Sequence, residues 1–205
     1  MTDTRRFDEI AAAWDADAAR VKLATAVADT INREVRLAPT MDVLDFGCGT
    51  GLLSCALRPF VRSVTGADTS AGMLDVMTRK ARERALDGVG VMWLRPENGY
   101  ALEGDYDLIV SSMALHHVAD LAALFARFRE RVRPGGQVAL ADLDLEDGTF
   151  HPPDVTDMFH RGFDRTAFKT LLAEAGFGRL RDATAFVHQR HGREYPIFLI
   201  SGVRE

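Results

Sequence analysis

Apolar residues recur at helical spacing in several stretches of the chain. The first two stretches cover residues 7–14 and 24–35, and a proline ends the second. Farther on, Ser70, Asp120 and Asp164 each stand where a side-chain oxygen can cap the first turn of a helix. The pattern therefore predicts two N-terminal helices and further helices over 51–57, 71–81, 121–132 and 165–175.

Short continuous apolar runs lie between these helical stretches. They predict five strands, at 41–46, 61–67, 90–94, 106–112 and 137–145. Two later runs, 179–187 and 195–203, flank a short polar stretch and predict a closing antiparallel hairpin. Because strands alternate with helices, we expect an α/β fold with a doubly wound, mostly parallel seven-stranded sheet covered by helices on both faces.

Composition and charge narrow the class of protein. With 205 residues, 47% of them hydrophobic, the chain suits one domain with a sizeable core. Its net charge of −5, with Lys and Arg dispersed among acids, predicts no nucleic-acid partner. No apolar run reaches the roughly 18 residues that span a bilayer, and the N-terminus lacks a signal-peptide pattern. We therefore expect a cytoplasmic protein without a membrane partner and with reduced cysteines.

The stretch VLDFGCGTGLL, residues 43–53, carries the strongest chemical signal. Asp45 is followed by glycines at every second position, Gly47, Gly49 and Gly51, directly after the first predicted strand. Without a Cβ, each glycine can adopt positive φ and let a ligand approach the backbone. Asp68 follows the second predicted strand, nineteen residues after Gly49, where a carboxylate can accept both hydroxyls of a ribose. Together these features predict an adenosine-containing cofactor.

The glycine spacing separates the possible cofactors. A dinucleotide-binding turn has the pattern G-x-G-x-x-G, whereas here the third glycine comes one position early and Leu52 follows it. A triphosphate-binding loop needs a Lys followed by Ser or Thr after the glycines, and this is missing too. The loop alone can also be a tight strand-to-helix turn, and Asp68 alone can be a helix-capping acid beside Ser70.

Four blocks in order resemble the class I S-adenosylmethionine-dependent methyltransferases. They are VLDFGCGTG, VTGADTSAGML, YDLIVSSMALHHV and FRERVRPGGQVAL, which together run over 43–140. Within that family the chain is similar to the small-molecule type found in ubiquinone and menaquinone biosynthesis. The resemblance implies a Rossmann-like fold, S-adenosyl-L-methionine as cofactor and S-adenosyl-L-homocysteine as product.

The resemblance also implies roles for individual residues. Asp45 and the backbone of Gly47, Cys48, Gly49 and Gly51 would hold the methionine end of the cofactor, and Asp68 the ribose. Thr69 and Met73 would flank the adenine, Ser111 and Met113 would lie near the sulfonium, and Trp14 would contact cofactor or substrate. Met73 and Trp14 also lie on apolar helical stripes, so a core position is an equal alternative.

The resemblance is loosest after the third strand. Relatives carry an acid there that holds the adenine amino group, but here the stretch is LRPENGYAL, and Glu97 is the candidate substitute. The implied organisation is a single domain with an N-terminal helical lid over 1–39, a cofactor-binding core over 40–145 and a substrate-side segment, helix and hairpin over 146–205.

Methyl transfer from a sulfonium needs positioning more than a dedicated catalytic motif. If the acceptor requires a general base, the candidates are His116 and His117 after the fourth strand, and His151 and His160 after the fifth. At most one of the adjacent pair is expected to face the pocket. His188 and His191 have metal-ligand spacing but are predicted in a hairpin turn without supporting ligands, so no metal is expected.

The prediction is therefore methyl transfer from S-adenosylmethionine to a small molecule bound between the N-terminal helices and segment 146–165. A non-catalytic S-adenosylmethionine-binding module or partner subunit is the alternative, and a nicotinamide-dependent oxidoreductase is a further one. The sequence leaves the acceptor and the oligomeric state open.

Overall fold

The fold was analysed in a computed structural model, which describes residues 5–151, 155, 158–190 and 192–205. A seven-stranded sheet forms its centre, with strand order β3-β2-β1-β4-β5-β7-β6. The strands are β1 (Asp42–Phe46), β2 (Ser63–Asp68), β3 (Val89–Trp93), β4 (Tyr106–Ser112), β5 (Val132–Leu143), β6 (Phe177–Arg190) and β7 (Arg193–Arg204). The first five are parallel, and β7 runs antiparallel to both β5 and β6. The predicted α/β fold with its closing hairpin is confirmed.

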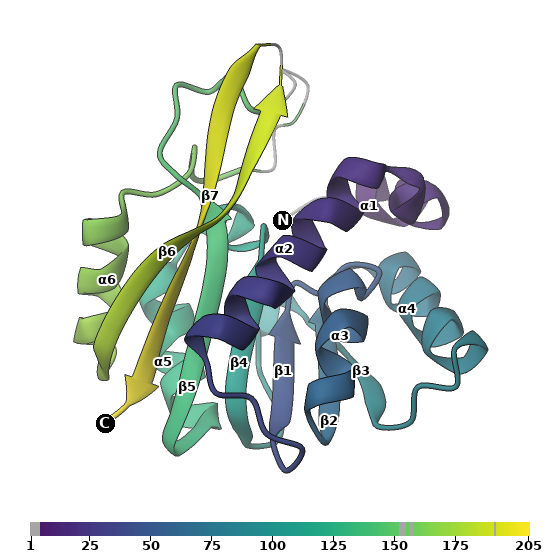
Figure 1. Ribbon diagram of the computed structural model, residues 1–205, viewed down its shortest axis with the longest axis horizontal. Coiled ribbons are helices and arrows are strands. Elements are labelled where there is room, and N and C mark those ends of the chain that lie inside the picture. Colours follow the sequence, from purple (N-terminus) through teal and green to yellow (C-terminus); the bar gives the residue numbers. More distant parts are fainter. Residues whose placement is uncertain (1–4, 152–154, 156–157, 191) are drawn as a thin grey trace.

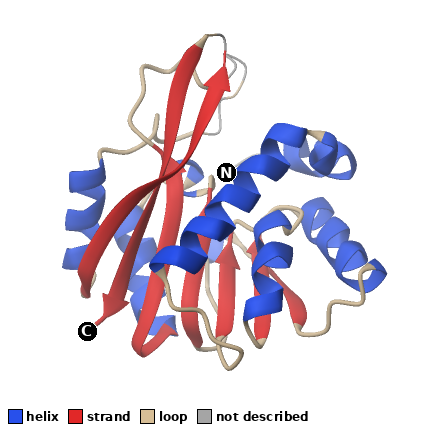
Figure 2. Ribbon diagram, viewed as in Figure 1, coloured by secondary structure: helices blue, strands red, loops and turns tan. Residues whose placement is uncertain are grey.

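Helices cover both faces of the sheet (Figures 1 and 2). The helical elements are α1 (Arg5–Ile10), η1 (Ala11–Ala16), α2 (Ala18–Glu34), α3 (Leu52–Leu57), η2 (Arg58–Phe60), α4 (Ala71–Glu83), η3 (Pro96–Asn98), η4 (Leu115–His117), α5 (Leu121–Arg131) and α6 (Arg165–Glu174). Apolar residues of α5 and α6 pack on one face, and those of α2 and α3 pack on the other. The caps predicted at Ser70, Asp120 and Asp164 all accept a backbone N–H of the first helical turn.

The fifth strand differs from the prediction at its start. Val132 was expected to end the preceding helix, with strand pairing from residue 137, but β5 already begins at Val132, which pairs with Tyr106. The register shifts between Tyr106 and Leu108, and Gly135 takes a φ of +76°. The prolines and glycines of this stretch therefore make an irregular strand entry rather than a separate loop.

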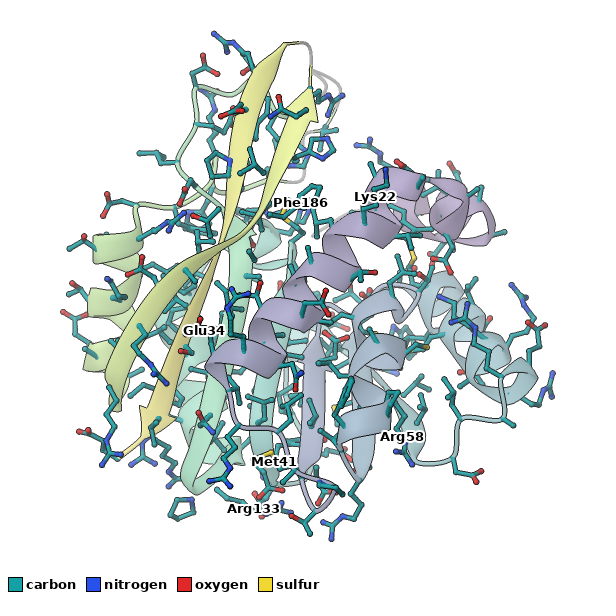
Figure 3. All side chains as sticks on the ribbon, viewed as in Figure 1. Lys22, Glu34, Met41, Arg58, Arg133 and Phe186 are labelled. Carbon is teal, nitrogen blue, oxygen red and sulfur yellow. The ribbon has the colours of Figure 1, made fainter. Side chains whose placement is uncertain are left out.

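Two smaller differences concern the N-terminal segment and the hairpin. The first predicted helix is divided into α1 and the 3₁₀ helix η1. His188 was expected in the hairpin turn but belongs to β6, where it lies half-buried, and His191 is outside the described residues. The hairpin extends beyond the other strands (Figure 1), and Phe186 of β6 packs into the cluster that includes α2 (Figure 3).

Candidate functional site

The glycine loop turns sharply between β1 and α3. Gly47, Gly49 and Gly51 have φ values of +70°, +53° and +78°, so the predicted positive φ is confirmed at all three. A Cβ at Gly47 would lie 2.2 Å from Cβ of Ala114, which shows that the loops after β1 and β4 are in direct contact. Among the described residues, a Cβ at Gly49 would meet only Sδ of Met73, at 4.0 Å. Gly49 therefore leaves room for a ligand against the backbone.

Asp68 holds this loop from the end of β2. Its Oδ2 accepts the backbone N–H of Gly49 at 2.7 Å, and its Oδ1 accepts that of Ser70 at 2.9 Å. Burial raises the pKa of Asp68, while these hydrogen bonds oppose the rise. The carboxylate thus lies beside the glycine loop, as its proposed contact with a ribose requires.

Asp45 is a second carboxyl group near the loop, and it is fully buried in β1. Burial raises its pKa to about 7; the hydroxyl of Ser54, which donates to Oδ2 at 2.5 Å, opposes the rise, and the charge of Asp68 adds to it. A cation placed beside Asp45 would favour its ionised form.

The two carboxyl groups, Asp45 and Asp68, distinguish between a dinucleotide, which carries a pyrophosphate, and S-adenosylmethionine, which does not. Asp45 and Asp68 are close enough to perturb one another electrostatically, so together they disfavour an added pyrophosphate. The same pair suits a ligand with an ammonium group and a ribose diol, such as S-adenosylmethionine. With the open backbone at Gly49, the described residues fit that cofactor.

Two acids of the N-terminal segment fasten it to the loop region. Oδ1 of Asp8 accepts the Ser70 hydroxyl at 2.6 Å and the Gly72 N–H at 2.9 Å. Asp15 accepts the hydroxyl of Thr50, and it pairs with Lys80 at 2.5 Å. Nζ of Lys80 also donates to the Thr50 carbonyl at 2.8 Å.

The sequence analysis did not identify these three charged residues, Asp8, Asp15 and Lys80. The sequence carries one signal for Lys80, because this cation lies on the apolar face of the helix α4.

The residues assigned to the adenine lie around the ends of β2 and β3. Met73 is buried, with its Sδ 4.0 Å from where a Cβ on Gly49 would lie. The Thr69 carbonyl accepts the indole N–H of Trp93 at 3.0 Å. Glu97 is exposed in η3. Leu94, which begins the divergent stretch, donates its N–H to the Asp68 carbonyl. Their contacts with adenine remain predictions.

The residues assigned to the sulfonium occupy different environments. The Ser111 side chain is buried and donates to the Phe46 carbonyl at 2.8 Å, which ties β4 to the end of β1. Met113 has a φ of +57° and packs against the apolar cluster below α2 and α3. Trp14 is half-buried, stacked by the Arg20 guanidinium at 3.7 Å, with the ring of Phe7 at 6.1 Å.

His116 forms a buried pair with Asp142 of β5. Nδ1 of His116 lies 2.7 Å from Oδ1 of Asp142, which also accepts the Leu143 N–H, while Oδ2 accepts the Leu115 and His116 N–H groups. Burial alone would raise the pKa of Asp142, but the charge and hydrogen bond of His116 lower it overall. Asp142 was missed from the sequence, although an acid inside an apolar strand was the available signal.

Three of the four candidate histidines are neighbours. The ring of His116 lies 4.3 Å from that of His117 and 5.1 Å from that of His151, measured between centroids. Burial and the two neighbouring histidines lower the pKa of His151 to about 3. Within the described part of the chain, its buried Nε2 has no hydrogen-bond partner.

His160 lies apart from this arrangement of rings. Its Nε2 is 3.0 Å from the Val118 carbonyl, and its ring packs on Phe163. Cys48 is also separate from any acid–base role, because burial raises the pKa of its thiol well above the usual range. Among the described residues, no group of three or more His, Cys, Asp or Glu side chains is arranged to hold a metal ion.

Two surface cavities lie away from the glycine loop. One, of about 390 Å³, is lined by the end of α4 and by β3, and the other, of about 330 Å³, by residues 144–147 and 193–196. Neither cavity is lined by Asp45 or Asp68. We therefore locate the candidate site by the chemistry of its side chains and not by the volume of a cavity.

The sheet order, the glycine loop and the acid at the end of β2 define a Rossmann-like cofactor-binding domain. A methyltransferase domain family matches residues 19–181 of the chain. An uncharacterised methyltransferase of Schizosaccharomyces pombe is 33% identical over 149 residues, which cover 66% of this chain and 52% of that protein. A ubiquinone biosynthesis O-methyltransferase of a Chelativorans species is 34% identical over 125 residues, covering 58% of this chain and 47% of that protein.

A solved structure supports the same fold. Magnesium protoporphyrin IX methyltransferase of Synechocystis, with bound S-adenosylhomocysteine, matches with a TM-score of 0.68 at 19% identity. The match covers 91% of this chain and 84% of that one.

The chain therefore belongs to the methyltransferase family. The predicted class I S-adenosylmethionine-dependent type is confirmed, and with it the expected fold and cofactor. The chain spans about half the length of these curated relatives. No helix among the described residues is long and apolar enough to cross a membrane.

Proposed function

We propose that this chain transfers the methyl group of S-adenosylmethionine to a small-molecule acceptor by in-line displacement. The observation that carries the proposal is the alternate-glycine loop, which is open at Gly49, held by Asp68 and placed beside the buried Asp45. In this proposal Asp45 acts on the ammonium end of the cofactor and Asp68 accepts the ribose hydroxyls. The cofactor supplies an electrophilic methyl group on a sulfonium and leaves as S-adenosylhomocysteine.

The protein contributes mainly by positioning and by excluding water. The N-terminal segment is held against the loop region through Asp8 and Asp15. Its Phe7 ring reaches the ring of His117, at 5.6 Å between centroids, so this segment also borders the histidines after β4. We place the acceptor between these N-terminal helices and segment 146–165, of which residues 152–154, 156 and 157 lie outside the described residues.

A small acceptor is supported by the small number of secondary-structure elements on the substrate side, which, over the described residues, form no separate domain for a large partner. The substrate side consists of the segment after β5, α6 and the β6–β7 hairpin, all part of one proposed domain over 1–205. The relatives point the same way, because one is named for ubiquinone biosynthesis and another for magnesium protoporphyrin IX. We propose no nucleic-acid partner, since the net charge is −5.

A non-catalytic cofactor-binding module is the competing function. It would share the loop and its acids but leave the methyl group on the cofactor. The nicotinamide alternative has lost its support, because the chain belongs to the methyltransferase family and two acids border the loop.

Calorimetric titration with S-adenosylmethionine, S-adenosylhomocysteine and NADH tests the cofactor. We expect the first two to bind and NADH not to bind. Asp68→Ala should weaken binding by about 2–3 kcal/mol, because charge-assisted hydrogen bonds to the ribose are lost. Asp87→Ala is the matched control, since Asp87 is an exposed acid just before β3, at the opposite edge of the sheet.

The outcomes separate the alternatives. Equal affinity in Asp68→Ala would remove the assignment of the ribose site. Tight binding without transfer of labelled methyl to any class of acceptor would favour the non-catalytic module.

A further inference from the structure

The histidines after β4 and β5, of which His116 is buried and His117 and His151 are half-buried, have an arrangement that cofactor binding does not explain. They stand next to the glycine loop, because a Cβ on Gly47 would touch Ala114, which directly precedes η4. Asp142 belongs to the neighbouring strand β5, and His151 follows the end of that strand. This placement brings the group to the carboxyl edge of the sheet, where parallel α/β sheets bind their ligands.

Asp142 fixes the orientation of His116. Both carboxylate oxygens accept backbone N–H groups, from Leu115, His116 and Leu143, so the carboxylate cannot turn away from Nδ1 of His116. A carboxylate against Nδ1 keeps the proton on that nitrogen in the neutral ring and leaves the lone pair on Nε2. The same relation of acid to imidazole makes histidine a base in hydrolases.

His151 provides the second observation. Its ring lies 5.1 Å from that of His116 and is neutral, because burial and nearby histidines lower its pKa to about 3. Its Nε2 is buried, and no described residue offers it a hydrogen bond. An orphaned buried polar atom is costly, and a ligand that supplies the partner removes this cost.

Two aromatic rings border the cluster formed by His116, His117 and His151. Phe150 packs edge-on against His151 at 4.8 Å, and Phe7 packs edge-on against His117 at 5.6 Å. Rings of this kind favour a planar apolar ligand whose polar group points at the imidazoles of His116 and His151.

We infer that His116, positioned by Asp142, is the general base of the methyl transfer and that the acceptor is a phenol whose hydroxyl also binds Nε2 of His151. This inference rests on the proposed methyltransferase function. A hydroxyl suits the pair because it donates its one proton to His116 and accepts a hydrogen bond from His151 in the Nε2–H tautomer. A phenol, with a pKa of about 10, needs help to ionise at neutral pH but is within reach of an imidazole base.

The chemical step balances with the groups named. The O–H bond of the phenol breaks and its proton passes to Nε2 of His116. An oxygen lone pair forms the new O–CH₃ bond to the sulfonium methyl. The C–S bond breaks with its electron pair left on sulfur, and the proton on His116 is later released to water. The products are an aryl methyl ether and S-adenosylhomocysteine.

The test compares two phenols with S-adenosylmethionine carrying a labelled methyl group. At about pH 8, 4-methoxyphenol is almost wholly protonated, because its pKa is about 10. At the same pH, 4-nitrophenol, with a pKa of about 7, is mostly ionised and needs no base. His116→Asn should lower kcat for 4-methoxyphenol by on the order of 10²-fold or more and should affect 4-nitrophenol far less. Asp142→Asn should show the same selectivity, because it disturbs the tautomer of His116.

Further variants keep the result interpretable. His151→Phe should raise KM for both phenols by roughly 10-fold, the loss of about one hydrogen bond. Asp87→Ala is the control, because Asp87 is an exposed acid just before β3 and lies outside the histidine cluster and segment 146–165, so its kinetics should match the wild type. Calorimetry with S-adenosylhomocysteine checks that each variant still folds and binds cofactor.

Several outcomes overturn the inference. Equal loss for both phenols in His116→Asn would show a structural role only. Methylation of anilines, thiols or carboxylic acids without any methylation of phenols would refute the acceptor class while leaving the proposed function intact. Absence of cofactor binding, or of transfer to every class of acceptor, would overturn the proposed function and this inference together.

Discussion

Asp45 is a buried acid that is suited to bind the ammonium group of the cofactor but lowers the stability of the ligand-free protein. Its pKa of about 7 arises mainly from burial, and the hydrogen bonds from the hydroxyl and the backbone N–H of Ser54 offset only part of the rise. The ligand-free protein therefore keeps a proton on Asp45 that the unfolded chain releases. Between about pH 4 and pH 7, this group makes the folded state less stable as pH rises.

Asp45→Asn should remove that pH dependence. Relative to the wild type, the variant should gain free energy of unfolding as pH rises from about 4.5 to 7.5, by about 2–4 kcal/mol at most. Urea denaturation at a series of pH values measures the difference. His151 and the acids with lowered pKa are present in both proteins and cancel in the comparison. Parallel curves for the two proteins would contradict the raised pKa of Asp45.

Glycine at position 49 is needed for two separable reasons, backbone strain and access for the ligand. Gly49→Ala should cost about 1–2 kcal/mol of stability, because its φ is +53°. It should also weaken S-adenosylhomocysteine binding by at least about 10-fold, because the methyl group points into the open space over the backbone.

Gly135→Ala provides the matched control for Gly49→Ala. Gly135 has a φ of +76° and, like Gly49, has open space where an alanine methyl group would lie, but it belongs to the start of β5. Denaturation should therefore show similar losses for the two variants, and calorimetry should show weaker binding for Gly49→Ala alone. Weaker binding in both would attribute the effect to general destabilisation.

At the scale of elements, the N-terminal segment depends on charged contacts with the glycine loop and α4. Lys80 is nearly buried, and Asp15 is its ion-pair partner. Removal of Asp15 leaves a buried cation without its charge partner, which is more costly than removal of an exposed pair. The segment should then detach more often while the sheet remains folded.

Asp15→Ala should therefore speed amide hydrogen exchange in residues 5–16 and shorten the residence time of S-adenosylhomocysteine. Glu9→Ala is the control, because Glu9 is an exposed acid of α1 in the same segment. Mass spectrometry after exchange measures the first effect and stopped-flow fluorescence the second. Identical exchange in the two variants would show that the Asp15–Lys80 pair does not hold the segment.

Elements with a strong local signal were predicted well from the sequence. The caps at Ser70, Asp120 and Asp164 and the apolar stripes after them indicated helices close to the observed bounds. The start of β5 was predicted wrongly, because a Pro-Gly-Gly stretch indicates a turn locally, whereas pairing of Val132 with Tyr106 on β4 extends the strand. Tertiary pairing overrode the local preference there.

At the scale of the whole molecule, long-range juxtapositions were the part that the sequence could not provide. Asp142 and His116 are 26 residues apart and meet only because β4 and β5 are parallel neighbours. Asp8 meets Ser70 across 62 residues because the N-terminal segment reaches α4. The glycine loop was predictable because its chemistry is contained in consecutive residues, whereas these pairs depend on the order and register of the strands.

Cofactor binding should stabilise the whole fold, because the site joins the sheet, α4 and the N-terminal segment. At a ligand concentration of 100 times Kd, mass action adds about 2.7 kcal/mol. For a domain of this size that corresponds to a rise in Tm of roughly 5–10 °C. Differential scanning calorimetry with S-adenosylhomocysteine measures it, and NADH at the same concentration is the control.

The Asp15→Ala variant makes this thermal measurement specific to the N-terminal segment. If closure of the segment contributes to ligand affinity, Asp15→Ala should show a smaller rise in Tm than the wild type at the same concentration of S-adenosylhomocysteine, because a weaker Kd lowers the mass-action term. Glu9→Ala should show the wild-type rise, since its exposed carboxylate lies on the same segment. Equal rises in all three proteins would mean that the ligand stabilises the sheet and α4 alone, with the N-terminal segment acting only as a passive cover.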